Sequence, residues 1–189
     1  MDGDVLSRTV SILALAVSAT TAWLTLFRRG RLQMTRPAIV FFGYDTSPNQ
    51  MPKIFLRALL FSTAKRGHVI ENMFVEVSHD GKSCTFSFWG YGDVKGLSPG
   101  SGLRVGEDGV VYNHHFLLSN NRGVFRFLPG QYVVRVYATT VYRTDPVLLS
   151  SIDLTLNAGD SMAAENKAQG IIFDWEPQTR RYYTHPGSP

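Results

Sequence analysis

Two adjacent histidines, His114 and His115, are the residues whose type best suits metal binding or acid–base chemistry. They lie in the apolar run VVYNHHFLL at residues 110–118, a composition that predicts a β-strand. Neighbouring side chains of a strand point to opposite faces, so the two imidazoles are poorly placed to bind one ion. We expect one histidine to face the core and the other to face solvent, and we expect no metal site.

The single cysteine, Cys84, is the one thiol available for nucleophilic catalysis. A thiol becomes a strong nucleophile when a neighbouring base or positive charge lowers its pKa. Cys84 instead alternates with polar residues in a run that includes Phe86 and Phe88, which predicts a position facing the core. One cysteine cannot form an intrachain disulfide, which suits a reducing compartment.

A glycine-rich stretch at residues 90–109 is the best candidate for a ligand-binding loop. Its GSG at residues 100–102 resembles the start of a dinucleotide fingerprint, but Val105 stands where the third glycine should be. The GKS at residues 81–83 resembles the end of a phosphate-binding P-loop, but Glu76 replaces its first glycine. A strand is predicted after residue 109, so no helix N-terminus would be available for phosphate. We expect no cofactor.

An apolar stretch near the N-terminus determines where the rest of the chain is expected to lie relative to a membrane. Residues 9–27 contain no ionisable side chain and lie between Arg8 and Arg28. As a helix they would rise about 1.5 Å per residue, which is enough to cross the roughly 30 Å hydrocarbon core of a bilayer. We therefore predict one transmembrane anchor within residues 1–27.

A cleaved signal peptide is the alternative interpretation of this stretch. Signal peptides carry positive charge before the apolar run and a small-x-small cleavage site after it. Here Asp2 and Asp4 precede the run, and it ends with Trp23 and other bulky residues. These flanks favour an uncleaved anchor.

The segment that follows, residues 28–36, is a basic juxtamembrane linker with four arginines. Flanks rich in Lys and Arg stay in the cytoplasm, and the opposite flank has only Arg8. We therefore predict a bacterial inner-membrane protein with its N-terminus outside and its domain in the cytoplasm. A periplasmic domain serving the cell envelope is the alternative. The residues expected at the membrane interface are Trp23, Arg28, Arg29 and Arg31.

The formal net charge of +4 could suggest nucleic-acid binding. Most of this charge belongs to the linker, because residues 37–189 carry 14 Lys and Arg against 13 Asp and Glu. A nearly neutral domain has little to gain from releasing counterions from nucleic acid. We expect the bilayer and a protein as partners, and no nucleic acid.

Short alternating runs with turn residues between them predict a mainly β domain at residues 37–156. The clearest signal is a hairpin, in which residues 73–77 and 84–88 alternate on either side of Asp80 and Gly81. An Asp-Gly pair supplies the positive φ angles of a tight turn. The fold class we predict is an antiparallel immunoglobulin-like β-sandwich preceded by one transmembrane α-helix.

The segment FLPGQY at residues 127–132 resembles the tyrosine corner of immunoglobulin-like domains. In that corner a tyrosine at the start of a strand donates a hydrogen bond to the backbone upstream, the role expected of Tyr132. A short strand is expected just before it, at residues 124–128. The cysteine pair of antibody domains is absent from this sequence, so the resemblance concerns the architecture.

The composition changes at residues 157–189, where we predict a short helix and a hairpin. Asp160 or Ser161 is the expected N-cap of the helix. The hairpin holds a compact aromatic and basic cluster that could contact a partner, because Trp, Tyr and Arg supply much of the energy of interfaces. The alternative is that the aromatic residues pack onto the domain. The cluster consists of Trp175, Arg180, Arg181, Tyr182 and Tyr183.

Several segments together resemble bacterial single-pass membrane proteins of unknown function with an immunoglobulin-like domain. The resemblance covers most of residues 37–156 and implies no catalytic residues. The segments are residues 53–60, 65–71 (KRGHVIE), 88–93 (FWGYGD), 113–116 (NHHF) and 127–132.

No motif of a known catalytic centre supports an enzyme, since neither G-x-S-x-G nor H-E-x-x-H occurs. We therefore predict a membrane-tethered interaction or scaffolding module without enzymatic activity. The alternative is a small membrane-anchored enzyme whose site combines the loop at residues 90–109 with His114 and His115.

Overall fold

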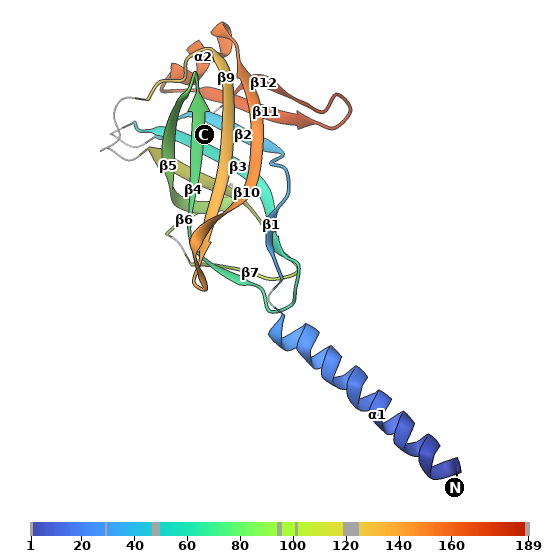
Figure 1. Ribbon diagram of the computed structural model, residues 1–189. Helices are drawn as coiled ribbons and strands as arrows, with labels where there is room; N and C mark the ends of the chain where they lie inside the picture. The colour runs from blue at the N-terminus through green and yellow to red at the C-terminus, as the bar shows by residue number, and fades with distance from the viewer. Residues whose placement is uncertain are drawn as a thin grey trace.

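The computed structural model describes residues 2–28, 30–46, 50–93, 96–100, 102–118 and 125–187, and it consists of an extended helix followed by a curled sheet (Figure 1). The helical elements are α1 (Asp2–Ala22), the π-helical turn η1 (Trp23–Phe27) and α2 (Ala158–Glu165). The strands are β1 (Leu32–Met34), β2 (Ile39–Tyr44), β3 (Pro52–Ser62), β4 (His68–His79), β5 (Lys82–Asp93), β6 (Gly96–Pro99), β7 (Leu103–Val105), β8 (Val110–Leu118), β9 (Gly130–Thr140), β10 (Arg143–Leu156), β11 (Gly170–Glu176) and β12 (Arg181–Gly187).

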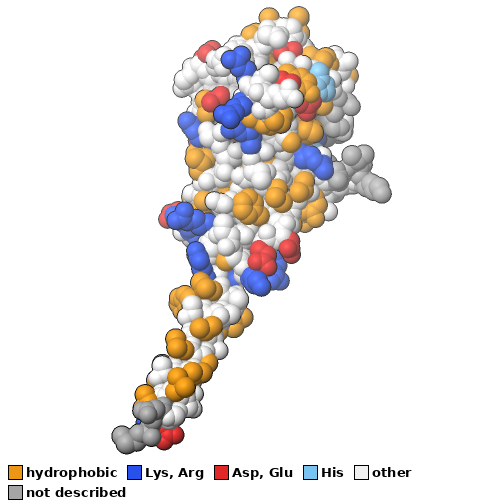
Figure 2. All heavy atoms as spheres, turned by 90° about the vertical axis from the view of Figure 1, so that its right-hand side faces the viewer, with side chains coloured by type: hydrophobic (Ala, Val, Ile, Leu, Met, Phe, Trp, Pro, Cys, Tyr) orange, Lys and Arg blue, Asp and Glu red, His pale blue; other side chains and the backbone are white. Residues whose placement is uncertain are grey.

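The N-terminal helix extends away from the sheet (Figure 1). Within Gly3–Phe27, the most apolar 18-residue window has a mean hydropathy of 1.9, and 0% of that window is buried. Figure 2 shows hydrophobic side chains spread along its surface. Hydroxyl groups of Thr9, Ser11, Thr20 and Thr21 donate to the carbonyl four residues earlier, as Thr20 does to Ala16 at 2.8 Å, which satisfies them inside an apolar helix.

The described strands form one antiparallel sheet whose main path is β10-β9-β4-β5-β8-β3-β2-β11-β12. Three short strands lie off this path: β1 pairs with β3, β6 with β5 and β7 with β4. The prediction of a mainly antiparallel β domain after one apolar helix is confirmed. The immunoglobulin-like sandwich is not confirmed, because hydrogen bonding links the strands in a single curled sheet.

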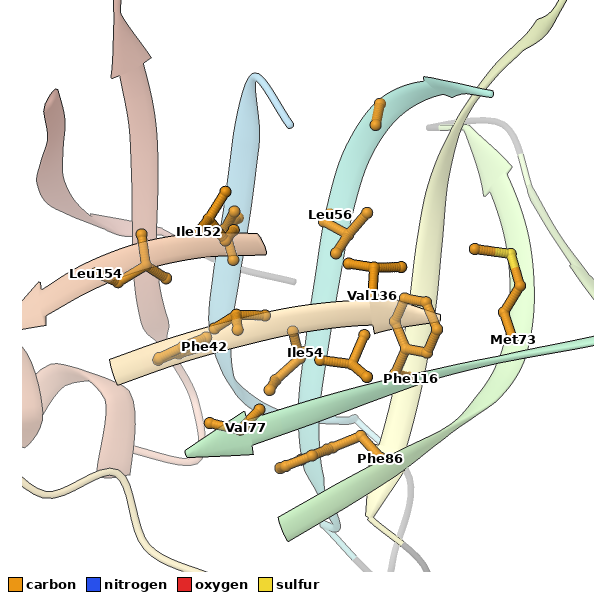
Figure 3. Close-up of a cluster of buried hydrophobic side chains, with 14 of the residues drawn as sticks. Phe42, Ile54, Leu56, Met73, Val77, Phe86, Phe116, Val136, Ile152 and Leu154 are labelled. Carbon is orange, nitrogen blue, oxygen red and sulfur yellow. The ribbon is translucent and has the colours of Figure 1, made fainter. Parts of the chain in front are cut away.

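The core lies inside the curl, between the β9–β10 half of the sheet and the β2–β3 half. Side chains from strands far apart in the sequence meet there, including Phe42 of β2, Val77 of β4 and Leu154 of β10 (Figure 3). These three side chains are each no more than 1% exposed. Burial of such apolar side chains is the main source of the domain's stability.

The hairpin predicted around Asp80 and Gly81 is confirmed. Strands β4 and β5 pair from His79↔Lys82 to Phe74↔Ser87. Asp80 and Gly81 have φ angles of 47° and 74°, as a tight two-residue turn requires.

The prediction of a long irregular loop at residues 90–109 is wrong for most of this stretch. Strand β5 continues to Asp93 and pairs with β6, while β7 pairs with β4. Glycines suggested a loop, yet Gly90 serves close strand packing, since a Cβ there would lie 2.8 Å from the carbonyl oxygen of Ser98. Residues 94, 95 and 101 of this stretch lie outside the described residues.

Both ends of the predicted domain extend into its flanks. Strand β1 lies within the expected linker at residues 28–36 and pairs with β3, and β11 pairs with β2. The expected helix and hairpin at residues 157–189 are present as α2 and β11–β12. The N-cap of α2 is Asn157, whose side chain accepts from the Asp160 N–H, so the expected cap at Asp160 or Ser161 is wrong by three or four residues.

The strand expected at residues 124–128 is not formed by residues 125–128, and residue 124 lies outside the described chain. Helix α2 holds this segment instead. The Phe127 N–H donates to Oε1 of Glu165 at 2.6 Å, and Ser161 Oγ donates to the Phe127 carbonyl at 2.5 Å. These side chains occupy the backbone groups that a neighbouring strand would have used.

Candidate functional site

A groove opens along the seam where the curled sheet fails to close. Its walls are β1 on one side and the first half of β10 on the other, and its volume is about 730 Å³. Pockets of this size are common ligand-binding sites. Its lining residues are Gly30, Arg31, Leu32, Gln33, Met34, Thr35, Phe61, His68, Thr140, Tyr142, Arg143, Val147, Leu148 and Leu149.

Among the described strands β1 pairs only with β3, so its other edge faces the groove. The Arg31 carbonyl accepts from the Thr63 N–H, and the Thr35 N–H donates to the Leu59 carbonyl. The backbone N–H and C=O groups of residues 31, 33 and 35 therefore point toward β3. By alternation, the backbone groups of Leu32 and Met34 point the other way. This side of β1 is a sheet edge.

The β10 wall is irregular for a reason visible in its sequence. Pro146 has no backbone N–H, and the β9–β10 register shifts between Arg143 and Val147 and again between Leu148 and Ser150. Such bulges disturb a strand's free edge and oppose pairing with a neighbour. The seam therefore stays open beside β1.

The apolar helix joins the sheet at the base of this groove through a very short connection. The Arg31 N–H donates to Thr63 Oγ1 at 2.8 Å, and the Thr63 N–H donates back to the Arg31 carbonyl at 3.0 Å. Gly30 has a φ of +70° and no room for a side chain, because a Cβ would lie 2.7 Å from the Ala64 nitrogen. Three residues separate the last helical residue, Phe27, from the fixed Arg31.

The end of the domain nearest the helix is formed by three further turns. The Ser62 N–H donates to the Gly106 carbonyl, and the Val141 N–H donates to the Val69 carbonyl. Val141 and Tyr142, at the tip of the β9–β10 hairpin, are 59% and 55% exposed. Basic residues outnumber acidic ones among the exposed side chains described here: Arg28, Arg31, Lys65, Arg66, Arg104 and Arg143, against Glu71, Glu107, Asp108 and Asp145.

Three of the four residues expected at a membrane interface, Trp23, Arg28 and Arg31, lie at the helix–sheet junction. Trp23 is 63% exposed and stacks on Phe27, with ring centroids 5.6 Å apart. Arg28 and Arg31 are exposed beside them, and Arg29 lies outside the described residues. Aromatic and basic side chains are thus adjacent where the apolar surface ends.

The two adjacent histidines face opposite sides of the sheet, as predicted, but both are buried. His114 is 0% exposed in the core, and His115 is 5% exposed on the other face, so the expectation of a solvated histidine is wrong. The ring centroids of His115 and Phe55 lie 5.2 Å apart, with the rings tilted by 39°. Phe55 of β3 lies directly opposite His115 in the sheet register and covers it.

Burial governs the charge of these histidines. It lowers the pKa of His114 to about 4, against a weaker opposing effect of the Ala58 backbone. It also lowers the pKa of His115 to about 4, helped by the positive charges of Lys53 and His114. Both imidazoles are therefore neutral at pH 7, and they lie on opposite sides of a strand rather than around one reaction centre.

The remaining candidates for chemistry are dispersed. Cys84 is partly buried and packs against the core, as its alternation predicted. Within the described ranges, no group of three or more His, Cys, Asp or Glu side chains could hold a metal ion. Residues 100 and 102 have positive φ angles near β6, and a strand rather than a helix follows them.

The C-terminal cluster divides between the two faces of its hairpin. Trp175 and Tyr182 pack together at 5.1 Å, the Arg36 guanidinium lies 4.0 Å from the Trp175 ring centre, and the Tyr182 hydroxyl donates to the Pro37 carbonyl at 2.6 Å. Arg180, Arg181 and Tyr183 are exposed. Two members thus hold the hairpin against the β1–β2 connection, and three face solvent.

Comparison with known proteins adds no assignment: no family model, curated protein or solved structure matches the chain.

The groove was not predicted from the sequence. Its walls come from residues 30–35 and 140–149, which no local pattern connects. The one available signal was Pro146 within a run of strand-forming residues, which marks an edge strand.

Proposed function

We propose that the protein is a membrane-tethered interaction or scaffolding module without enzymatic activity, held at the cytoplasmic face of a bacterial inner membrane. The observation that carries this proposal is the exposure of the apolar helix. A 25-residue helix with 0% of its apolar window buried does not serve as the core of a soluble domain. Large apolar surfaces are covered in the cell, and a bilayer covers a helix of this length.

The short helix–sheet connection supports a domain held close to the lipid. An extended chain spans at most about 3.5 Å per residue, so the stretch from Phe27 to Arg31 spans roughly 14 Å. Because Gly30 and Arg31 are held by their contacts with the domain, the connection between the helix and the sheet cannot become longer than this. The basic and aromatic residues of this end would then lie among the lipid headgroups.

Membrane anchoring is tested by fractionating bacterial cells that express the full-length chain. We expect the protein to stay in the membrane pellet after a carbonate wash. Leu15→Arg, in the middle of the helix, should release a large part of it, because an arginine at the bilayer centre costs about 2.5–3.5 kcal/mol. Ser18→Ala is the matched control. Recovery of the uncleaved protein in the soluble fraction would refute the proposal.

The orientation rests on the arginines that follow the helix. Fusion of a reporter after residue 187 tests it with two reporters, one fluorescent only in the cytoplasm and one enzymatically active only in the periplasm. We expect signal from the first. Signal from the second alone would replace the cytoplasmic proposal with a periplasmic one and leave the membrane anchor intact.

The exposed side of the C-terminal hairpin is proposed to contact a protein partner. Tyr183 is 53% exposed, and Arg180 and Arg181 lie beside it in the β11–β12 turn region. A photo-crosslinker at Tyr183 should capture one defined protein in cells, and Arg181→Ala should weaken the capture. The same crosslinker at Val111, 49% exposed on β8, is the control position. Equal yields at both positions would contradict this contact.

A further inference from the structure

We propose that the seam groove between β1 and β10 binds one acyl chain of an anionic phospholipid, whose headgroup lies at Arg31 and Arg143. This inference rests on the proposed membrane anchor. It adds a specific ligand and a specific site to that function.

The groove starts where the helix meets the sheet and runs away from it. Strand β1 leads upward from Arg31, and β10 leads upward from Arg143 at the base of the β9–β10 hairpin. From Arg31 to Thr35 the wall is about 13 Å long at about 3.3 Å per residue. A lipid chain that leaves the bilayer at this junction meets the lower mouth of the groove first.

The walls are mainly apolar although the groove is open. Leu32 and Met34 form one wall, and Val147 and Leu149 form the other. Leu148, at the mouth, is 51% exposed. An acyl chain would cover this surface and gain about 0.8 kcal/mol per buried methylene group.

A peptide strand is the other occupant that two sheet edges suggest, and the spacing disfavours it. An inserted strand needs its neighbours about 9.5 Å apart, twice the usual spacing between strands. Cα atoms of β1 and β10 lie within 8 Å of each other. The β-bulges of β10 also oppose pairing with an inserted strand. A hydrocarbon chain needs no hydrogen bonds.

The charges at the lower mouth favour an anionic headgroup. Arg31 and Arg143 are both exposed there, and Tyr142 lies between the groove and the hairpin tip. Arginine forms paired hydrogen bonds with phosphate oxygens. Asp145 is the acidic residue nearest to Arg143 in the sequence, and it is exposed rather than part of the groove lining.

The experiment uses the full-length protein in nanodiscs of phosphatidylcholine and phosphatidylglycerol, with a photo-crosslinking amino acid at Leu148. Mass spectrometry then measures lipid adducts. Val111 is the control position at a similar height, because it pairs with Leu59, whose carbonyl accepts from Thr35. Val141, at the hairpin tip, is the control for contact with the bilayer itself.

We expect strong lipid adducts at Leu148 and weak ones at Val111. Val147→Trp fills the groove and should reduce the Leu148 adduct more than about tenfold, since two buried methylene groups already correspond to such a change in affinity. Gln33→Trp, at an exposed lining position, should act in the same direction without touching the core. Neither change should alter the Val141 adduct, which also reports that the variants remain folded in the membrane.

Three results would overturn the inference: equal adducts at Leu148 and Val111, a Leu148 adduct unaffected by either tryptophan, or a peptide adduct at Leu148 in place of lipid. Nanodiscs of phosphatidylcholine alone test the headgroup, and an equal yield there would refute the anionic preference. Failure of the membrane anchor gives a different result, because the protein would not be retained in nanodiscs. Retention without a Leu148 adduct refutes the groove alone.

Discussion

The Tyr132 hydroxyl donates a hydrogen bond to the carbonyl of Leu128, 2.6 Å away and four residues earlier. Tyr132 is 1% exposed and stacks on His79 at 4.3 Å. The bond fixes the corner at Pro129 and Gly130, where the chain turns into β9. This is the relationship predicted from FLPGQY, although the sheet as a whole is a single curled one.

Tyr132→Phe removes the hydroxyl and leaves its carbonyl partner without this donor. We expect a loss of about 1–2 kcal/mol in the free energy of unfolding. Urea unfolding of the detergent-solubilised protein, followed by tryptophan fluorescence, measures it. Tyr183→Phe, at an exposed position, is the matched control and should change little. Equal stability of the two variants would show that the corner bond contributes nothing.

Gly30→Ala should destabilise the helix–sheet junction. The φ of +70° disfavours alanine, and the new Cβ would lie 2.7 Å from both the Ala64 nitrogen and Thr63 Oγ1. Strain of this kind costs about 1–3 kcal/mol. Gly106→Ala is the control, because nothing lies within 4 Å of a Cβ there. Faster proteolysis within residues 28–35 of Gly30→Ala, absent from the control, checks the prediction, and unchanged proteolysis contradicts it.

Glu165→Ala should loosen the contact between α2 and the segment before β9. Glu165 Oε1 accepts from the Phe127 N–H at 2.6 Å and from the Tyr44 hydroxyl at 3.3 Å, while Oε2 accepts from Arg126. Loss of hydrogen bonds to a charged group costs about 1.5–3 kcal/mol. Glu165→Gln keeps an acceptor and should retain part of the stability, as chemical denaturation can measure. A glutamine variant as unstable as alanine would assign the effect to charge alone.

His114 should make the protein less stable as the pH falls. Its pKa is about 4 when folded and about 6.5 when unfolded, so the unfolded state binds the proton first. Its contribution is complete above pH 6.5 and is lost as the pH falls toward 4, by on the order of 3 kcal/mol. The variant His114→Leu should therefore show a weaker dependence of the unfolding free energy on pH in this window. An unchanged slope would mean that other groups set it.

Local features were predictable from the sequence because their causes are local. Asp80 and Gly81 define their turn through φ alone, and the hydroxyls of α1 find carbonyls one turn away. Gly90 is the opposite case, because it allows close contact with β6 and does not belong to a loop. His115 is buried beside Phe55, its cross-strand neighbour on β3. Such burial depends on the pairing of distant strands, which a single sequence does not state.

Buried and exposed residues alternate at residues 152–156 of β10, a pattern typical of a half-buried strand. Its first half, from Arg143, is exposed or partly buried and lacks that alternation. This half is also the wall of the groove. The first half of β10 could not be predicted from the alternation of residues, because it faces an open seam and not a packed core.

Strand β1 is both a wall of the groove and the direct continuation of the apolar helix. The contacts of Gly30 and Arg31 with Thr63 and Ala64 fix the start of β1 to the turn after β3. Strand β1 is therefore the lip of the seam that follows the helix directly in the chain. If the helix spans a bilayer as proposed, we expect a change in its tilt, such as bilayers of different thickness impose, to act on this lip first.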